Sequence, residues 1–415
     1  MSAVSASMQT GYLAFIRDNA PFLGVGALLA LLSSFGQTFF ISIFGGEIRS
    51  AFSLSNGDWG VTYMIGTLAS AALMVFAGGL ADQFRVRTLG IAVVVCLGLS
   101  CLAMAFNGSV AILIGIIFLL RFFGQGMSMH MATVAMSRWF VASRGRALAV
   151  SGMGFMIGEM TLPLIMVWLK SIVDWRVLWV CFGVVCFAMA VVLFRLLRLE
   201  RTPQAEAEEN SSTGMRGRHW TRGDALRNPM FWLIMPGVIF FSAFGTAFWF
   251  HQVHFAEVKG WSHLALVAVF PLGTATLMAA TIAYGWAIDR FGAVSLLPFY
   301  VIPYILAFVL HWYAPSLMWI GLGVMLMGAG QAGNGTIINA CWAEFYGTNH
   351  IGAIKAAATA AMVFGSAIGP GISGILIDYG VGIEIQMLGF AACFTVSAVL
   401  MAVAARMFQH STTAA

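Results

Sequence analysis

The sequence contains few charged residues. Only 9% of its 415 residues are Asp, Glu, Lys or Arg, whereas 60% are hydrophobic. A water-soluble domain of this length needs far more charge to cover its surface, so the composition predicts lipid as the main solvent. The net charge of +5 is no sign of a nucleic-acid partner, because the Lys and Arg residues are confined to short segments between apolar runs.

The sequence also lacks the common signatures of catalytic and metal sites. It has no Walker-type phosphate-binding loop, no GxSxG elbow and no HExxH pair. Its six cysteines all lie inside apolar stretches, and none stands at the CxxC spacing of zinc ligands. We therefore expect no enzymatic activity, no cofactor and no metal. Any work done by the protein has to draw on ion or substrate gradients, since nothing here is suited to hydrolysing ATP.

What the sequence has is a series of long apolar runs. A helix that crosses a hydrocarbon core of about 30 Å needs about 20 apolar residues. The pattern therefore predicts an all-α membrane protein with twelve transmembrane helices. The twelve segments lie within residues 22–46, 58–80, 88–107, 110–136, 146–169, 175–197, 229–255, 263–288, 294–312, 316–341, 352–377 and 382–407.

The cations between these runs predict the orientation. With the N-terminus inside, sixteen Lys and Arg residues lie on the cytoplasmic side and four lie outside. The positive-inside rule then places both termini in the cytoplasm. The expected location is the plasma membrane, which is the inner membrane if the protein is bacterial, and the expected functional unit is a monomer.

One internal segment, residues 200–228, is polar and shows no apolar periodicity. It predicts a flexible cytoplasmic linker between an N-terminal six-helix bundle, residues 1–199, and a C-terminal six-helix bundle, residues 229–415.

The two halves repeat the same residue patterns 206 to 209 positions apart. Five matches in order predict a duplicated bundle, with two pseudo-symmetric copies around an axis along the membrane normal and a substrate site at their interface. Function would then be alternating access. The recurring pairs are Phe35-Gly36 with Phe244-Gly245, Gly78-x-x-x-Asp82 with Gly285-x-x-x-Asp289, Gly124-Gln125 with Gly330-Gln331, Trp139-Phe140 with Phe345-Tyr346, and Gly158 and Pro163 with Gly365 and Pro370.

Two charged residues stand out inside the predicted spans. Arg121 lies halfway along the fourth helix and Glu159 halfway along the fifth, at similar depth. A charge at the bilayer centre is costly, so each needs a reason. In one interpretation Arg121 attracts an anionic substrate and Glu159 takes up a proton, with the two separating and rejoining. In the other, they form a permanent pair, or Arg121 bonds to the backbone of the first helix.

Histidines near the ends of helices also allow two interpretations. His251 and His254 lie toward the outer end of the seventh helix, with Glu257 beyond them, and His130 lies near the inner end of the fourth. They fit either a proton relay or ordinary histidines at the membrane interface.

The loop after the eighth helix, Gly285-Trp-Ala-Ile-Asp289-Arg290-Phe-Gly292, resembles the GxxxDRxG signature of the major facilitator superfamily, and Glu344-Phe-Tyr-Gly347 is also typical of it. The resemblance covers the whole chain and implies the major facilitator fold. It also implies that Asp289 and Arg290 lie near Glu344 and clamp the cytoplasmic helix ends, and we pair Asp82 with Arg138 in the first half.

The same resemblance implies that helices 1, 4, 7 and 10 line the cavity. Their polar and aromatic residues near mid-depth are then candidate substrate contacts beside Arg121, since amides bind an anion or a neutral solute equally well. These residues are Gln37, Thr38, Gln125, Thr246, Trp249, Gln331 and Asn334.

The loop between helices 4 and 5, Arg138-Trp-Phe-Val-Ala-Ser-Arg-Gly-Arg-Ala-Leu-Ala149, resembles the monocarboxylate and oxalate/formate transporter group. That group moves small organic anions by proton symport or anion exchange. Its first-helix motif is absent, and Thr281 occupies the position of its helix-8 arginine. An anion site must be built differently, or the substrate is not a simple carboxylate. The predicted function is proton-coupled transport of a small, monocarboxylate-like organic anion; the alternative is a proton-coupled transporter or exporter of a neutral or cationic molecule.

Overall fold

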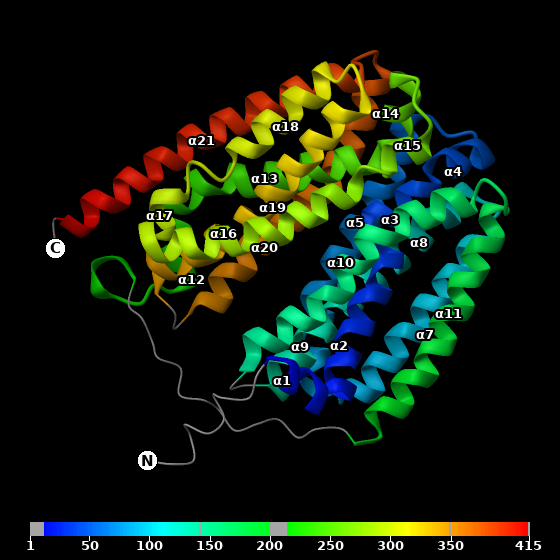
Figure 1. Cartoon of the computed structure of the whole chain (residues 1–415), viewed down its shortest axis with the longest axis horizontal. Helices are drawn as coiled ribbons and strands as arrows, with labels where there is room; N and C mark the ends of the chain where they lie inside the picture. Colours follow the sequence, from blue (N-terminus) through cyan, green and yellow to red (C-terminus); the bar gives the residue numbers. More distant parts are fainter. Residues whose placement is uncertain (1–11, 141–142, 200–213, 348–349, 414–415) are drawn as a thin grey trace. The chain divides into compact units, whose positions relative to one another are not determined.

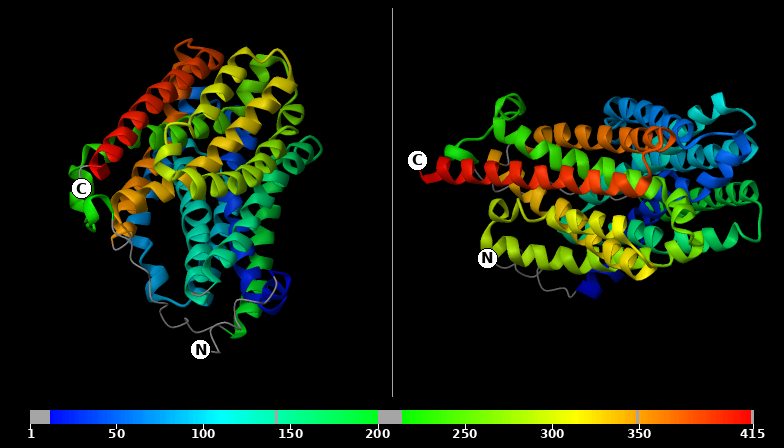
Figure 2. Two further views of the ribbon diagram at one scale, coloured as in Figure 1. Left: turned by 60° about the vertical axis from the view of Figure 1, so that its left-hand side comes forward. Right: turned by 90° about the horizontal axis from the view of Figure 1, so that it is seen from above.

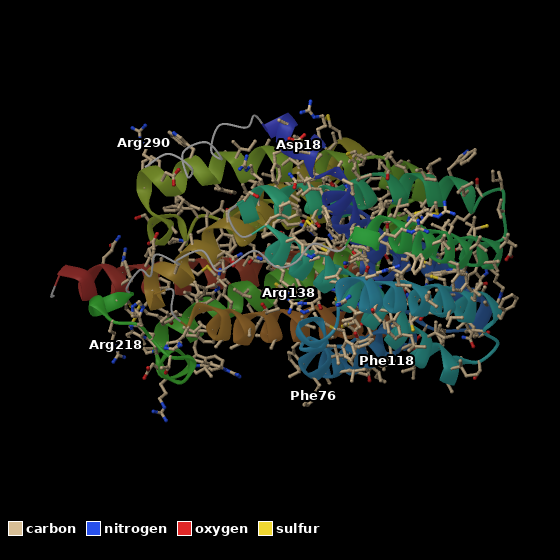
Figure 3. The ribbon with its side chains drawn as sticks, turned by 90° about the horizontal axis from the view of Figure 1, so that it is seen from below. Asp18, Phe76, Phe118, Arg138, Arg218 and Arg290 are labelled. Carbon is tan, nitrogen blue, oxygen red and sulfur yellow. The ribbon has the colours of Figure 1, made fainter. Side chains whose placement is uncertain are left out.

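The computed structural model is built from helices joined by short loops (Figure 1). It describes residues 12–140, 143–199, 214–347 and 350–413, and these contain no β-strand. The prediction of an all-α fold is confirmed. Large apolar side chains cover much of the surface; Phe76, for example, is 80% exposed and points away from the ribbon (Figure 3). Such a surface is suited to lipid rather than to water.

Among the described residues, nine helical segments are long and apolar enough to cross a membrane. A tenth results if Ala20–Gly36 and Thr38–Phe52 form one broken span. The remaining two predicted spans differ from simple apolar helices. Residues 294–312 contain a helix of only 12 residues, Ile302–Tyr313, and the helix at 316–341 includes Gln331 and Asn334, which lower its hydropathy. The number of twelve spans and the location of the termini remain predictions.

The chain forms two compact units. Unit 1 comprises Met1–Phe40, Ala72–Leu162 and Val173–Glu208. Unit 2 comprises Ile41–Ala71, Pro163–Ile172 and Glu209–Ala415. This grouping differs from the predicted division at residues 200–228, because two short segments of the first half pack with the second half. The division of the sequence into two bundles at that linker stays a prediction.

Unit 1 contains most of the first half. Within it α7 runs beside α11 (Figure 1), α2 packs on α9, and η2 packs on η4. The helices that lie wholly or partly in unit 1 are α1 (Tyr12–Asp18), α2 (Ala20–Leu32), η2 (Ser33–Gly36), α3 (Thr38–Ile41), α6 (Leu80–Gln83), α7 (Val86–Phe106), α8 (Val110–Leu120), η4 (Arg121–Ser128), α9 (Met129–Trp139), α10 (Arg144–Leu169), α11 (Trp175–Leu196) and η6 (Leu197–Leu199).

Unit 2 contains the second half, together with residues 41–71 and 163–172 of the first half. Its main helix pairs are α13 with α20, α16 with α19, and α18 with both α19 and α21 (Figures 1 and 2). Its helices are η3 (Ser42–Phe44), α4 (Gly45–Phe52), α5 (Asn56–Ala77, which continues into unit 1), η7 (Met215–Gly217), α12 (Arg222–Arg227), α13 (Pro229–Phe250), α14 (Gln252–Lys259), α15 (His263–Val267), α16 (Phe270–Phe291), α17 (Ala293–Leu296), α18 (Ile302–Tyr313), α19 (Leu317–Tyr346), α20 (Ile351–Asp378) and α21 (Ile383–Thr413).

The second part of the predicted linker, residues 214–228, has defined structure. Thr221 and Asp224 form a capping box that begins α12. The backbone N–H of Trp220 donates to the carbonyl oxygen of Tyr346 at 3.0 Å, and the two aromatic rings meet edge to face. The expectation of a flexible linker was wrong for this part, because a buried Trp and a helix cap stabilise it.

Candidate functional site

The first predicted span is interrupted at its middle. The 3-10 helix η2 ends at Gly36, Gln37 is extended with φ −82° and ψ 152°, and α3 begins at Thr38. The facing segment of the fourth span is a π-helix, η4, from Arg121 to Ser128. Irregular backbone at membrane depth is tolerated where protein buries it or where it lines a cavity, and π-helical turns are frequent at functional sites.

The two irregular segments touch through glycines. A side-chain carbon added at Gly36 would collide with the carbonyl oxygen of Leu120 and would lie 2.7 Å from the Cα atom of Gly124. The backbone nitrogen of Gln125 lies equally close, at 2.8 Å from that added carbon. Only glycine allows the two backbones to approach this closely. The Phe35-Gly36 and Gly124-Gln125 patterns therefore meet at one crossing inside unit 1.

Arg121 lies at this crossing and is almost completely buried, with 1% of its surface exposed. Its Nη1 atom donates to the carbonyl oxygen of Gly36 at 3.1 Å and to Oγ1 of Thr38 at 3.3 Å. In a continuous helix Phe40 N–H would bond to Gly36, but here it bonds to the carbonyl oxygen of Gln37. The guanidinium thus satisfies a backbone acceptor that the helix break leaves open.

This contact matches the second interpretation of Arg121, in which the arginine bonds to the first helix. Among the described residues Arg121 forms no ion pair with Glu159. The structure therefore places a buried positive charge beside the helix break, and the counter-charge is not Glu159.

Three polar side chains of unit 1 lie near this crossing, or on helices packed against it, with their hydrogen-bonding capacity unused. Gln37, Gln125 and Glu159 are each half-buried, and none has a side-chain hydrogen bond to a described residue. Helix α10 carries Glu159 and packs closely on η2, since a side-chain carbon added at Gly158 would lie 3.3 Å from Cβ of Ser34. The local arrangement is one guanidinium, two free amides and one carboxyl group.

The other four predicted substrate contacts lie in unit 2. Trp249 on α13 packs its ring edge-on against Phe270, with 4.6 Å between centroids. Thr246 and Gln331 are half-buried, and their side chains form no hydrogen bond with the described residues. Asn334 on α19 has a buried Oδ1 atom without a hydrogen-bond donor among the described residues. An unsatisfied buried acceptor is uncommon and marks a position where a ligand or water is expected.

A set of contacts that the sequence did not reveal joins the first half to the second inside unit 2. Because the predicted orientation puts the loop between α4 and α5 outside, we name this set the outer cluster. Its members are far apart in the sequence, up to 321 positions, so no local pattern predicts them. The outer cluster consists of the pairs Ser42–Gln252, Gly57–Asp378 and Trp59–Phe250.

The geometry of the outer cluster is close and specific. Asp378 Oδ2 accepts from the backbone N–H of Gly57 at 2.8 Å, in the first turn of α5, where a negative charge is stabilising. The Nε2 atom of Gln252 donates to Oγ of Ser42 at 2.7 Å, and both side chains are buried. The ring of Trp59 stacks on Phe250 with 5.2 Å between centroids. The first and second halves of the sequence are therefore in direct contact at the outer cluster.

The family model described as Major Facilitator Superfamily matches residues 26–370. The chain belongs to the major facilitator superfamily. It is therefore a membrane transporter and not an enzyme.

The chain is similar to several transporters, and these similarities say more about its fold than about its substrate. The probable sulfoacetate transporter SauU of Cupriavidus necator is 26% identical over 171 residues, which are 41% of this chain and 39% of that protein. The chain thus matches about two fifths of that relative's length. A crystal structure of a bacterial homologue of the human lysosomal transporter Spinster, inward-facing and unoccupied, has a TM-score of 0.70, 17% identity and coverage of 95% and 98% of the two chains. The nucleoside transporter NupG has a TM-score of 0.67, 13% identity and coverage of 94% and 99%.

The loop residues that the superfamily signature singles out have local partners in the structure. Glu344 Oε1 accepts from the backbone N–H of Ala293 at 3.0 Å and so fixes the start of α17. Asp289 and Arg290 are exposed, and the Arg290 guanidinium lies over the rings of Trp286 and Phe291 at the end of α16 (Figure 3). In this part of the chain no ion pair connects Asp289 or Arg290 with Glu344, so a charge clamp stays a prediction.

The equivalent loop of the first half is held by Arg138. Its Nη1 atom donates to the carbonyl oxygen of Ala81 at 2.6 Å. The side chain of Asp82, its predicted partner, lies outside the described residues. The Arg138 side chain therefore contacts the backbone of the signature loop, at Ala81, which is the residue before its predicted partner Asp82.

The predicted histidines contact backbone or acidic groups. His251 is 3% exposed and its Nε2 atom lies 3.0 Å from the carbonyl oxygen of Pro370, so it is buried between helices. His254 Nδ1 lies 3.8 Å from Glu257. His130 bonds to the carbonyl oxygen of Gly78 at 3.1 Å.

Proposed function

We propose that this chain is a secondary active transporter that moves a small organic anion by alternating access, coupled to protons. The observation that carries the proposal is the buried charge of Arg121 at the crossing of η2 and η4, beside Gln37 and Gln125. A guanidinium, with amide donors on the same two segments, is suited to a carboxylate or sulfonate group. The Gly36 carbonyl and the Thr38 hydroxyl hold the guanidinium at this crossing.

The sulfoacetate transporter that matches part of the chain supports an organic anion as substrate. Its name indicates a substrate that carries both a sulfonate and a carboxylate. Such a substrate also fits the absence of the arginine that the monocarboxylate group has at the position of Thr281, because the anion site then depends on Arg121. We propose that Thr38 on the first half, and Thr246, Trp249, Gln331 and Asn334 on the second, contact the rest of the substrate.

Alternating access is supported by the outer cluster. For substrate to enter from that side, the pairs Ser42–Gln252, Gly57–Asp378 and Trp59–Phe250 have to separate and later re-form. Each pair joins one half to the other, so each reports the same transition. We further propose twelve spans, cytoplasmic termini, a plasma-membrane location and a monomeric functional unit, with Asp82, Arg138, Asp289, Arg290 and Glu344 stabilising the cytoplasmic ends.

A second candidate is a transporter of a neutral or cationic molecule in exchange for protons. Two observations favour it: Arg121 already donates to helix 1, and Glu159 is a carboxyl group inside a span without a described partner. Such a carboxyl group is suited to proton uptake whatever the substrate is. In the first candidate Arg121 contacts the substrate, whereas in the second it only supports helix 1. In both candidates Glu159 takes up the proton.

Uptake into proteoliposomes tests both the substrate class and the coupling. Radiolabelled small carboxylates and sulfonates, a nucleoside and a quaternary amine are each supplied with and without an imposed proton gradient. We expect the gradient to accelerate uptake of one or more of the anions. Glu159→Gln is expected to abolish the acceleration by the gradient and to leave exchange of labelled for unlabelled substrate intact, because the carboxyl group that takes up the proton is missing.

Asp18→Asn is the matched control, since Asp18 lies before the first predicted span and its side chain is mostly exposed. It is expected to leave the gradient response unchanged. An unchanged gradient response in Glu159→Gln would remove Glu159 from the coupling. Uptake of the nucleoside or the amine, with no uptake of any anion, would replace the first candidate with the second.

A further inference from the structure

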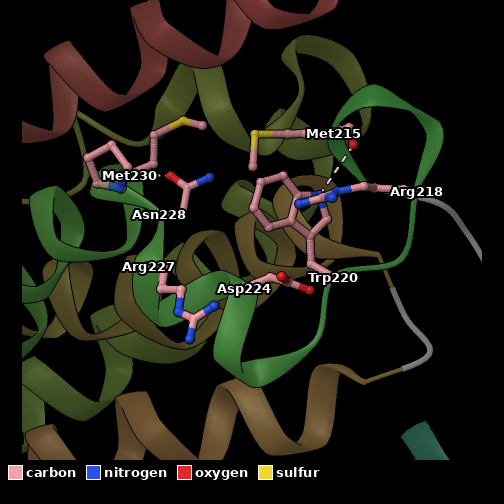
Figure 4. Close-up of a pocket in the computed structure, with 8 residues that line it drawn as sticks. Met215, Arg218, Trp220, Asp224, Arg227, Asn228 and Met230 are labelled. Carbon is pink, nitrogen blue, oxygen red and sulfur yellow. Dashed lines mark hydrogen bonds between the residues drawn. The ribbon is translucent and has the colours of Figure 1, made fainter.

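A pocket lies where the linker enters the second half. It has a volume of about 320 Å³ and is formed entirely by the end of the linker and the first residues of α13 (Figure 4). None of the proposed substrate contacts borders it. Its lining residues are Met215, Arg218, Trp220, Asp224, Arg227, Asn228, Pro229 and Met230.

The floor of this linker pocket is apolar and held in place by hydrogen bonds. Met215, Trp220 and Met230 are buried. The indole Nε1 of Trp220 donates to the carbonyl oxygen of Met215 at 3.2 Å (Figure 4), and the backbone of Trp220 donates to Tyr346 on α19. At the α13 side, Oδ1 of Asn228 accepts from the backbone N–H of Met230 at 2.9 Å. The pocket is therefore formed before any ligand binds.

The rim of the linker pocket is charged. The Arg218 guanidinium stacks 4.1 Å above the ring of Trp220, and Arg227 also lines the pocket, on α12 near Asp224 (Figure 4). Both arginines are exposed, and neither is within ion-pair distance of a carboxylate in the described chain. Asp224 is also on the rim, but its Oδ2 atom accepts from the N–H and the hydroxyl of Thr221. These bonds lower the pKa of Asp224, and the rim keeps a net positive charge.

The position of the pocket relative to lipid follows from α13. This helix is one of the membrane spans, and the pocket is at its first turn. Trp232, three residues after Pro229, is 58% exposed and donates from its indole Nε1 to the carbonyl oxygen of Leu226 at 2.8 Å. An exposed Trp with a bonded indole N–H at a helix end is typical of the membrane–water interface. In the predicted orientation the arginines are then expected at the depth of the lipid headgroups.

We propose that the linker pocket binds the phosphate headgroup of an anionic membrane phospholipid. Arg218 and Arg227 contact the phosphate, for which planar guanidinium groups are well suited, and Met215 and Met230 contact the glycerol and the first methylene groups. Basic pockets next to transmembrane helices on the cytoplasmic side are recurrent anionic-lipid sites. A bound lipid would fasten residues 214–228 to the membrane surface.

Lipid retention by the purified full-length protein tests this proposal. The protein is incubated in detergent with phosphatidylglycerol or phosphatidylcholine, and bound lipid is counted by native mass spectrometry. We expect retention of phosphatidylglycerol but not of phosphatidylcholine. The double variant Arg218→Gln/Arg227→Gln is expected to lose retention by at least about tenfold, since each arginine near an anionic headgroup contributes about fivefold. Arg218→Lys/Arg227→Lys, which keeps the charge, is expected to retain an intermediate amount.

Arg222→Gln is the matched control. Arg222 is exposed on α12, the short helix that also carries Arg227, but it does not line the pocket. It should retain phosphatidylglycerol like the unchanged protein. A further arm adds millimolar glycerol phosphate or inorganic phosphate, which is expected not to displace the lipid. Equal loss in the control and the double variant, equal retention of phosphatidylcholine, or displacement by the soluble phosphates would overturn the proposal; the last outcome would identify a free phosphate compound as the ligand.

Discussion

Replacing Arg121 with glutamine is expected to lower uptake of the organic anion at least about 30-fold, because removing one partner of a buried charged contact costs about 2–5 kcal/mol. The loss should appear as weaker substrate binding, since the proposed partner of Arg121 is the substrate's anionic group. Uptake in proteoliposomes gives the rate, and the substrate-induced rise in melting temperature of the purified protein gives binding independently of transport.

Two further variants separate binding of an anion from support of helix 1. Thr38→Val removes the hydroxyl that accepts from Arg121 at 3.3 Å and one proposed substrate contact, but it leaves the charge in place, so the substrate-induced rise in melting temperature should be reduced less than in Arg121→Gln. Arg121→Lys keeps the charge and should retain part of the binding. If Arg121 only supports the helix break, Thr38→Val and Arg121→Gln will lower the melting temperature without substrate, and carboxylates and sulfonates will still bind to Arg121→Gln. That result would end the anion-site proposal.

Gly374→Val is expected to lower uptake about tenfold or more and to trap the outer cluster open. A side-chain carbon at Gly374 would collide with the carbonyl oxygen of Asn56 and lie 3.2 Å from the Cα atom of Gly57. Overpacking at such a contact costs about 1–3 kcal/mol, and here it acts on the closed state alone. The start of α5 would move off α20, and the bond from Gly57 to Asp378 would break. A cysteine placed at Ser42, which is buried in the closed state, should then react with a membrane-impermeant maleimide added outside.

Gly389→Val is the matched control for this substitution. Gly389 lies near the same end of the neighbouring helix α21, and a side-chain carbon added there meets no atom within 4 Å. Its uptake and its cysteine labelling should resemble those of the unchanged protein. Normal uptake by Gly374→Val, or a similar loss in both variants, would mean that the contact between α5 and α20 does not have to close during transport.

The sequence predicts the helices far better than it predicts their irregularities. Apolar runs identify the helices, because the cost of an unsatisfied backbone in lipid leaves few alternatives. The repeat also marks the important crossing, since Gly36 and Gly124 were both in it. The break at Gln37 and the π-helix that begins at Arg121 have no sequence signal of their own. They depend on the close approach of two helices, which is a tertiary effect.

The partners of the polar residues were beyond prediction for a similar reason. Asp378 and Gly57 are 321 positions apart, and nothing near either residue indicates the other. The buried state of His251 depends on the turn after α13, whereas its position in the sequence resembles an interface. In the linker, polar composition concealed the one useful signal, Trp220, a large apolar ring in an otherwise charged segment.

Alternating access itself is most directly tested by locking the outer cluster. The buried side chains of Ser42 and Gln252 are in contact across the two halves, so cysteines at both positions can be joined by a short, reducible bifunctional methanethiosulfonate reagent, with the native cysteines replaced by alanine. A second pair at Ser373 and Gln386, which are also in contact but both belong to the second half, controls for the chemistry. We predict that the link between Ser42 and Gln252 stops uptake until it is reduced and that the control link does not. Uptake that continues at the same rate through the locked outer cluster would contradict the account.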